Sequence, residues 1–155
     1  MFLGIDVGTQ SVKALIYDPD SRRVAEIVSA PLNLISKADG TREQLAQWWL
    51  EALGQCLLGL SNTHKSGIEA IGVSGQQHGF VPLGAEGQVL APVKLWCDTA
   101  TLAECEQITA NFGGRERCIS EVGNPILPGL SLYTSDAADD LTRVAIGARR
   151  QPDDN

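Results

Sequence analysis

The chain has 155 residues, of which 43% are hydrophobic and 20% are charged, as is typical of one soluble globular domain with a real core. Nineteen acidic and twelve basic side chains give a net charge of −7 at pH 7, and no cluster of lysines and arginines interrupts this acidity. These values argue against binding to nucleic acid or to an anionic membrane, and against a second substantial domain.

The N-terminus has neither the basic segment nor the apolar run of a signal peptide. No stretch approaches the roughly 18 uninterrupted apolar residues that cross a bilayer. We therefore expect a cytoplasmic protein without a membrane partner. The four cysteines form no CxxC pair and show no zinc-ligand spacing, so we expect free thiols at Cys56, Cys97, Cys105 and Cys118.

The first stretch, residues 2–18, predicts a strand, a tight turn and a second strand. In its sequence, FLGIDVGTQSVKALIYD, an apolar run ends on Asp6, a turn follows around Gly8, and apolar residues then alternate with polar ones. Residues 24–31 predict a third strand, so the three strands would form an antiparallel meander. The pattern alone is also compatible with a plain structural hairpin.

This turn has the residue types of a phosphate site. Gly8 permits a positive φ and a close approach to a ligand, and the amides and hydroxyls of Thr9 and Ser11 are hydrogen-bond donors. Lys13 adds a positive charge. Asp6 offers a carboxylate that is able to hold a metal ion directly or through water. Neither a Walker-type loop nor a GxGxxG string occurs in the chain.

The next element predicted is a helix over residues 42–59. Apolar residues recur at intervals of three and four, and Thr41 with Gln44 has the spacing of a capping box at its start. We expect at least one of Trp48 and Trp49 to pack this helix onto the sheet, in preference to stacking on a ligand.

Beyond this helix the chain is expected to return to the sheet. His64 lies in a polar connection and is expected to be solvated, and residues 68–73 predict a buried strand parallel to one of the first three. Residues 80–90 suggest a short hairpin. A second helix is expected over residues 102–112, opening with a capping-box spacing at Thr101.

Two polar clusters follow separate extended segments and suggest a ligand pocket. Open α/β sheets present ligand-binding side chains at such positions. A histidine, two amides, a carboxylate and an indole face suit a polyhydroxylated ligand, which needs directed hydrogen bonds and an apolar platform. The residues alone leave open that His78 and Asp98 only satisfy neighbouring loop backbone. The two clusters are Gln76–Gln77–His78 and Trp96–Cys97–Asp98.

Two strings resemble one known family. GIDVGTQSVKALIYD closely resembles the first phosphate loop of the ATPase superfamily that contains actin, hexokinase, the heat-shock chaperone ATPases and the FGGY carbohydrate kinases. IGVSGQQHGFVPLGAEGQVLAPVKLWCDTATLAECEQI is similar in string and order to the FGGY kinases, most of all to xylulokinases. The resemblance implies an α/β, ribonuclease H-like fold of the actin/hexokinase type, N-terminal part only, with a mixed sheet and flanking helices.

By this resemblance the activity would be ATP-dependent phosphorylation of a ketose, D-xylulose in the first place, with Mg²⁺ held at Asp6. A glycerol kinase would carry Arg-Glu where this chain has Gln77-His78, and many relatives have an arginine where this chain has Ala100. The residues implied for phosphate and ATP are Gly8, Thr9, Gln10, Ser11 and Lys13. Those implied for the sugar are Gln77, His78, Trp96 and Asp98.

The resemblance covers residues 2–129 and then stops. The string LYTSDAAD at residues 132–139 resembles the translation of a transposase adapter, so we expect residues 130–155 to be a foreign or frame-shifted tail with a disordered end. The general-base Asp and most adenine contacts of the family would lie beyond Gly129. We therefore expect residues 1–129 to be an incomplete first domain, inactive alone and with apolar surface exposed.

Other readings stay open at this point. One is a non-catalytic actin-like or chaperone-like nucleotide-binding module, although such a module has no reason to carry Gln77-His78 and Trp96-x-Asp98 after two strands. Another is a ribonuclease H-like protein with a different chemistry. The sequence also leaves open which ketose is used and whether the full-length protein forms a homodimer.

Overall fold

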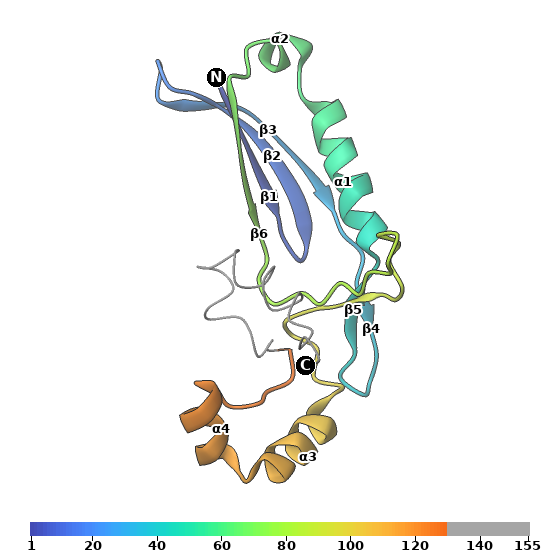
Figure 1. The fold of residues 1–155 in the computed structure, drawn as a ribbon. Coiled ribbons are helices and arrows are strands. Elements are labelled where there is room, and N and C mark those ends of the chain that lie inside the picture. Colours follow the sequence, from blue (N-terminus) through green and yellow to red (C-terminus); the bar gives the residue numbers. More distant parts are fainter. Residues whose placement is uncertain (130–155) are drawn as a thin grey trace, which may run out of the picture.

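The computed structural model describes residues 1–129 (Figure 1). Within them, one sheet has the strand order β3-β2-β1-β6 and a smaller sheet has the order β4-β5-β7. The strands are β1 (Phe2–Val7), β2 (Ser11–Asp18), β3 (Arg23–Pro31), β4 (Ile35–Ser36), β5 (Arg42–Gln44), β6 (Ala70–Gly75) and β7 (Val93–Lys94). The helices are α1 (Ala46–Gly59), α2 (Asn62–Lys65), α3 (Leu102–Phe112) and α4 (Arg115–Val122).

The larger sheet confirms the predicted meander and the predicted parallel strand. β1 pairs antiparallel with β2, β2 pairs antiparallel with β3, and β6 pairs parallel with β1. Asp6 on β1 lies opposite Lys13 on β2 and Ser74 on β6. These three side chains therefore share one face of the sheet, because directly opposed residues project to the same side.

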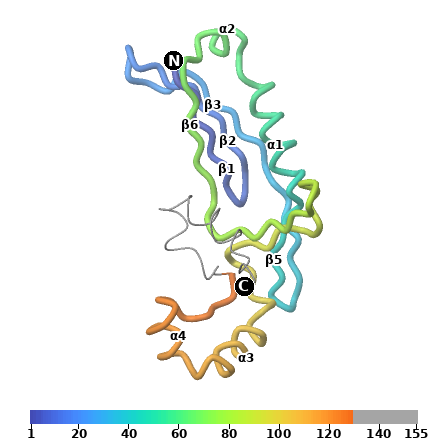
Figure 2. Tube along the Cα trace, in the orientation of Figure 1, coloured from blue at the N-terminus to red at the C-terminus, as the bar shows by residue number. Residues whose placement is uncertain are grey.

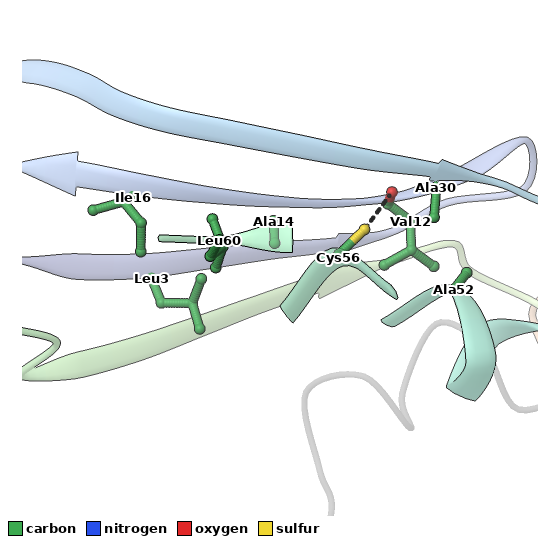
Figure 3. Packing of buried hydrophobic residues seen from close by; sticks show 8 residues of the cluster. All are labelled: Leu3, Val12, Ala14, Ile16, Ala30, Ala52, Cys56 and Leu60. Carbon is green, nitrogen blue, oxygen red and sulfur yellow. Dashed lines mark hydrogen bonds between the residues drawn. The ribbon is translucent and has the colours of Figure 1, made fainter. Parts of the chain in front are cut away.

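Helix α1 covers the other face and forms the core with β1, β2 and β3. Its last turn approaches β3 closely, since a Cβ on Gly59 would lie 2.9 Å from Val28 Cγ1. The Cys56 thiol donates to the Val12 carbonyl across 3.3 Å, and burial raises the pKa of this thiol. The buried residues are Leu3, Val12, Ala14, Ile16, Ala30, Ala52, Cys56 and Leu60 (Figure 3).

Strand β6 was expected to be buried, and this expectation is wrong for the chain as described. All six of its residues are exposed, including Ile71 at 62% and Val73 at 70%. Helix α1 lies over β2 and β3 and leaves the edge strand uncovered (Figure 1). The apolar residues correctly predicted a strand here, but within residues 1–129 no other layer of the chain packs on its face.

The expected start of the first long helix is also wrong. Residues Arg42–Gln44 form strand β5, and α1 begins only at Ala46, after Leu45. The Thr41 hydroxyl donates to Asp39 in place of capping a helix. Strand geometry prevails here because Gln44 pairs with Val93 of β7 and is completely buried. The helix ends at Gly59 as expected.

His64 is not simply solvated. It lies in α2, and its Nδ1 is 2.8 Å from Glu26 Oε2, with both side chains largely covered. The backbone N–H and the hydroxyl of Ser61 also donate to this carboxylate. These hydrogen bonds, that of His64 first, hold the pKa of Glu26 below its usual value. The cluster ties the end of α1 to β3.

Helices α3 and α4 lie apart from the larger sheet, beyond the small one (Figure 2). The hairpin predicted at residues 80–90 is present: Leu83 and Val89 form an antiparallel bridge, and the Gly84 and Leu90 N–H groups donate to the Gln88 and Pro82 carbonyls. Helix α3 begins after Thr101 as expected, without a hydrogen bond from the Thr101 side chain, and ends at a left-handed Gly113. Helix α4 follows directly and was not predicted.

Two general expectations can be checked in the described part. The four cysteines are free thiols, as expected. Among residues 1–129, no helix is long and apolar enough to span a bilayer. The predicted foreign tail, residues 130–155, lies outside the described residues, so it stays a prediction.

Candidate functional site

The turn between β1 and β2, residues 7–11, is closed by its own backbone. The Gly8 N–H donates to the Ser11 carbonyl across 3.1 Å. Gly8 does not use a positive φ, contrary to the reason given for it above. Glycine is favoured here because a Cβ at this position would lie 3.0 Å from the Ser11 oxygen, a tight contact with backbone. We call residues 7–11 the phosphate turn, after the role that the sequence predicts for them.

Opposite charges lie beside the phosphate turn on the sheet face that α1 leaves free. Asp6 and Lys13 face each other across β1 and β2, and both are exposed. Residues 1–129 contain no group of three or more side chains with metal-ligand chemistry. A lone carboxylate fits Mg²⁺ in nucleotide sites, where the ion takes one or two carboxylates and completes its shell with phosphates and water.

Side chains from two other elements hold the carbonyls of the phosphate turn. The Trp49 indole on α1 donates to the Gly8 carbonyl across 3.2 Å, and the Gln44 amide on β5 donates to the Thr9 carbonyl across 2.9 Å. The Leu32 N–H donates to the Gln10 carbonyl across 2.9 Å. Three successive peptide groups are therefore fixed in direction.

The Thr9 hydroxyl joins the phosphate turn to both polar clusters. It donates to Gln76 Oε1 across 2.8 Å and accepts from the Trp96 indole N–H across 3.3 Å. The Gln76 N–H in turn donates to the Val7 carbonyl. The clusters that follow β6 and β7 thus meet at the turn, as the sequence predicts for a shared pocket.

Gln77 and His78 lie one and two residues beyond this contact. His78 has a φ of 60°, a left-handed conformation that is uncommon outside glycine but enriched in histidine. Its Nδ1 is buried and has no partner among the described residues. An unpartnered buried nitrogen is costly in a protein interior unless a ligand or water uses it. The Gln77 side chain is exposed.

Asp98 is held by the protein itself. It is 2% exposed, and its two oxygens accept hydrogen bonds from the Arg42 N–H at 2.8 Å and the Ala100 N–H at 3.1 Å. The Lys94 ammonium lies 3.5 Å from it and 3.0 Å from Glu43. The hydrogen bond to Glu43 is the main reason why the pKa of Lys94 is raised. These contacts fit the alternative role of Asp98 in fixing its loop, while contact with a substrate stays a prediction.

The end of the described chain returns to the same loop. Gly129 has a φ of 70°, and a Cβ on it would collide with the carbonyl of Trp96. Only a residue without a side chain fits this close approach, which places Gly129 against the Trp96–Asp98 loop.

Several residues at the site were not expected from the sequence. The Gln44 amide, the Trp49 indole N–H, Gln76 as the partner of Thr9, and Lys94 beside Asp98 all emerge from the structure. The packing role expected of Trp49 is present too, since its ring lies against the core. A residue-by-residue pattern carries no signal for the first three, because their partners lie 35 to 67 positions away in the sequence. Lys94, by contrast, lies only four residues before Asp98.

Comparison with known proteins decides the family. Residues 1–134 match the N-terminal domain of the FGGY family of carbohydrate kinases. The chain belongs to this family. The match continues five residues past Gly129, where the resemblance was expected to stop.

Similar proteins in the FGGY family carry a consistent name. The chain is 38% identical to the xylulose kinase of Haemophilus influenzae over 130 residues, which is 79% of this chain and 26% of that protein. It is 35% identical to the xylulose kinase of Bacillus subtilis over 134 residues, 84% of this chain and 26% of that protein. The chain therefore spans about a quarter of the length of these relatives.

Solved structures agree on the fold. A xyloylose kinase from Brucella ovis superposes with a TM-score of 0.71 at 30% identity, over 95% of this chain and 30% of that chain. A glycerol kinase from Plasmodium falciparum with ADP superposes with a TM-score of 0.73 at 16% identity, over 94% and 31% of the two chains, and supports the fold alone. The predicted actin/hexokinase-type α/β fold is thereby confirmed.

Proposed function

We propose that residues 1–129 supply the phosphate turn and part of the sugar pocket of an ATP-dependent ketose kinase, which converts D-xylulose to D-xylulose 5-phosphate. The observation that carries this proposal is the Thr9 hydroxyl, which is hydrogen-bonded to Gln76 of one polar cluster and to Trp96 of the other. Such a joint brings a predicted phosphate site and a predicted sugar site into contact. The names of the most similar relatives supply the substrate.

On the nucleotide side, the phosphates of ATP lie along the turn, near Gly8, Thr9, Gln10 and Ser11. Lys13 adds a positive charge on the same sheet face as Asp6. Asp6 holds Mg²⁺, directly or through water, and the ion neutralises charge on the phosphates when it is bound.

On the sugar side, Gln77, His78 and Trp96 line the pocket. The unpartnered Nδ1 of His78 supports this role, because a sugar hydroxyl would satisfy it. Trp96 is 53% exposed and offers an indole face beside these polar groups. Asp98 contributes by holding its loop in place, and any hydrogen bond to the sugar would use its remaining lone pairs.

Phosphoryl transfer to a sugar hydroxyl also needs a base that takes the hydroxyl proton. Within residues 1–129, Asp98 is committed to backbone amides and Lys94, and Asp6 is assigned to the metal. We place the base beyond Gly129. Because residues 130–155 are predicted to be a foreign tail, the 155-residue chain alone is then inactive, although it retains the phosphate turn.

The test is ADP release by the longest polypeptide that the gene encodes, with D-xylulose, D-ribulose and glycerol as acceptors. We expect turnover with D-xylulose and a large loss in the His78→Ala variant. His64→Ala is the matched control, because His64 lies on α2 beside Glu26 and not at the turn. Nucleotide binding without any dependence on sugar would instead favour a non-catalytic nucleotide-binding module and would overturn the proposal.

A further inference from the structure

Two successive carbonyls of the phosphate turn are held by side-chain donors. Trp49 Nε1 donates to the Gly8 carbonyl and Gln44 Nε2 donates to the Thr9 carbonyl. None of the described peptide bonds is cis. In a planar trans peptide the C=O and the next N–H point in opposite directions. The N–H groups of Thr9 and Gln10 therefore point away from the two side chains that hold the carbonyls.

These two N–H groups have no acceptor of their own within residues 1–129. Thr9 and Gln10 lie outside the strands, and the hydrogen bonds of the turn use the Gly8 N–H and the carbonyls. A pair of neighbouring backbone N–H groups in a turn makes a concave site for an anion. The arrangement leaves two donors available on the ligand side of the turn.

Gln44 is a buried polar residue whose amide is directed at the backbone. It is completely buried, and its Nε2 also donates to the Asn33 carbonyl across 2.6 Å, so both amide protons are used. Its Oε1 has no partner in the described structure. An apolar side chain of the same size would avoid this unsatisfied oxygen, but it would leave the Thr9 and Asn33 carbonyls without their donor. The Gln44 amide is therefore held between two backbone acceptors, one of which belongs to the phosphate turn.

Both donors stand on regular elements of the fold. Trp49 is on helix α1, whose other side chains form the core, and Gln44 is on β5, which pairs with β7 just before Trp96. Regular elements hold a side chain in a more precise direction than a loop does.

We propose that Trp49 and Gln44 are positioning residues, which hold the Gly8 and Thr9 carbonyls so that the Thr9 and Gln10 amides face the phosphates of the nucleotide. This positioning role depends on the proposed function in one respect, namely that a nucleotide binds at the phosphate turn. The two residues touch no substrate themselves and act through the peptide groups that they orient.

The test compares Trp49→Phe, which keeps an aromatic ring and removes the N–H, with Trp48→Phe on the same helix turn, which makes the same change in size. Gln44→Met removes the second donor at similar length. Affinities for MgATP, MgADP and adenosine are measured by calorimetry on the longest polypeptide that the gene encodes. Because one hydrogen bond is lost, we expect Trp49→Phe to weaken MgATP and MgADP about two- to tenfold, with adenosine within about twofold and Trp48→Phe unchanged.

The outcomes separate the two proposals. An unchanged affinity for MgATP in Trp49→Phe, or an equal loss for adenosine, would overturn the positioning role. A wild-type protein that binds no adenine nucleotide would overturn it as well. A loss confined to the phosphorylated nucleotides, in a protein that transfers no phosphate to D-xylulose, would support the positioning role and remove the proposed function. If Gln44→Met does not fold, Trp49→Phe still decides.

Discussion

The indole nitrogen of Trp96 lies 3.3 Å from the hydroxyl of Thr9, 87 positions earlier in the chain. The same hydroxyl donates its only proton to Gln76 Oε1, which lies 2.8 Å away. A threonine hydroxyl has one donor and two acceptor sites, so this joint uses the donor and one acceptor. The loop that follows β7 is thereby hydrogen-bonded to the phosphate turn.

This joint predicts the effect of removing the Thr9 hydroxyl. Thr9→Val keeps the β-branched shape but leaves the Trp96 N–H and the Gln76 oxygen without their partner. With two hydrogen bonds lost at about 0.5–1.5 kcal/mol each, we expect kcat/KM to fall about tenfold or more. Steady-state kinetics of the longest polypeptide that the gene encodes, with D-xylulose and ATP, measure this.

Thr9→Ser is the control for that change, since it retains the hydroxyl. We expect it to stay within a few-fold of the wild type. If Thr9→Val and Thr9→Ser behaved alike, the hydroxyl would have no part in the site.

Asp98 gives a prediction on stability. Its two oxygens accept from different backbone N–H groups, so Asp98→Asn would turn an NH₂ group toward one of these donors. We expect the free energy of unfolding to fall by about 1–3 kcal/mol, the cost of leaving a buried polar group unsatisfied. Urea unfolding of the longest gene product measures it.

The exposed Glu106 on α3 provides the control, because Glu106→Gln removes the same charge outside any buried contact. We expect it to change the free energy of unfolding by less than about 0.5 kcal/mol. Equal stability of Asp98→Asn and the wild type would show that the loop does not depend on this carboxylate.

The sequence predicted those parts of the fold whose signals are local. The meander of β1, β2 and β3 follows from alternating apolar residues and short turns, and the end of α1 at Gly59 follows from its helical periodicity. The sequence also suggested that the two polar clusters converge, and one residue of each, Gln76 and Trp96, reaches the Thr9 hydroxyl. They meet there although β6 and β7 belong to different sheets, so their shared role at a ligand stays a prediction.

Long-range strand pairing explains why the predicted start of the first long helix is wrong. The spacing of Thr41 and Gln44 suits a capping box, yet Gln44 pairs with Val93, 49 residues later, and that pairing makes a strand. Helix α4 was missed because its residues are mostly polar and only Cys118 is buried. A local sequence pattern likewise carries no information about a strand partner as distant in the sequence as Val93 is from Gln44.

The cluster around Glu26 predicts an acid-dependent loss of stability. Hydrogen bonds from His64 and Ser61 lower the pKa of Glu26 in the folded protein. A lowered pKa stabilises the fold at pH values above the usual glutamate pKa of about 4.3, and this contribution is lost as the pH falls through the folded pKa. Glu26→Gln removes the contribution.

The stability difference between wild type and Glu26→Gln should therefore be constant near neutral pH and shrink below about pH 4.3. Urea unfolding midpoints between pH 7 and pH 3 measure it, with Glu106→Gln as the charge-matched control. A difference that stays the same down to pH 3 would mean that the Glu26 cluster does not contribute to the fold in this way.

The exposed edge strand predicts how the 155-residue chain behaves alone. Ile71 and Val73 point to the sheet face that α1 covers only over β2 and β3, and they are 62% and 70% exposed. An apolar edge strand with unpaired backbone groups is a template for association. We expect the purified chain to bind a hydrophobic dye and to self-associate.

The double variant Ile71→Thr, Val73→Thr tests this expectation, because it keeps β-branched side chains but is less apolar, so it should bind less dye. A sharp, cooperative melt of a monomeric, dye-free chain would contradict this, because it would mean that the fold is complete without a layer over β6.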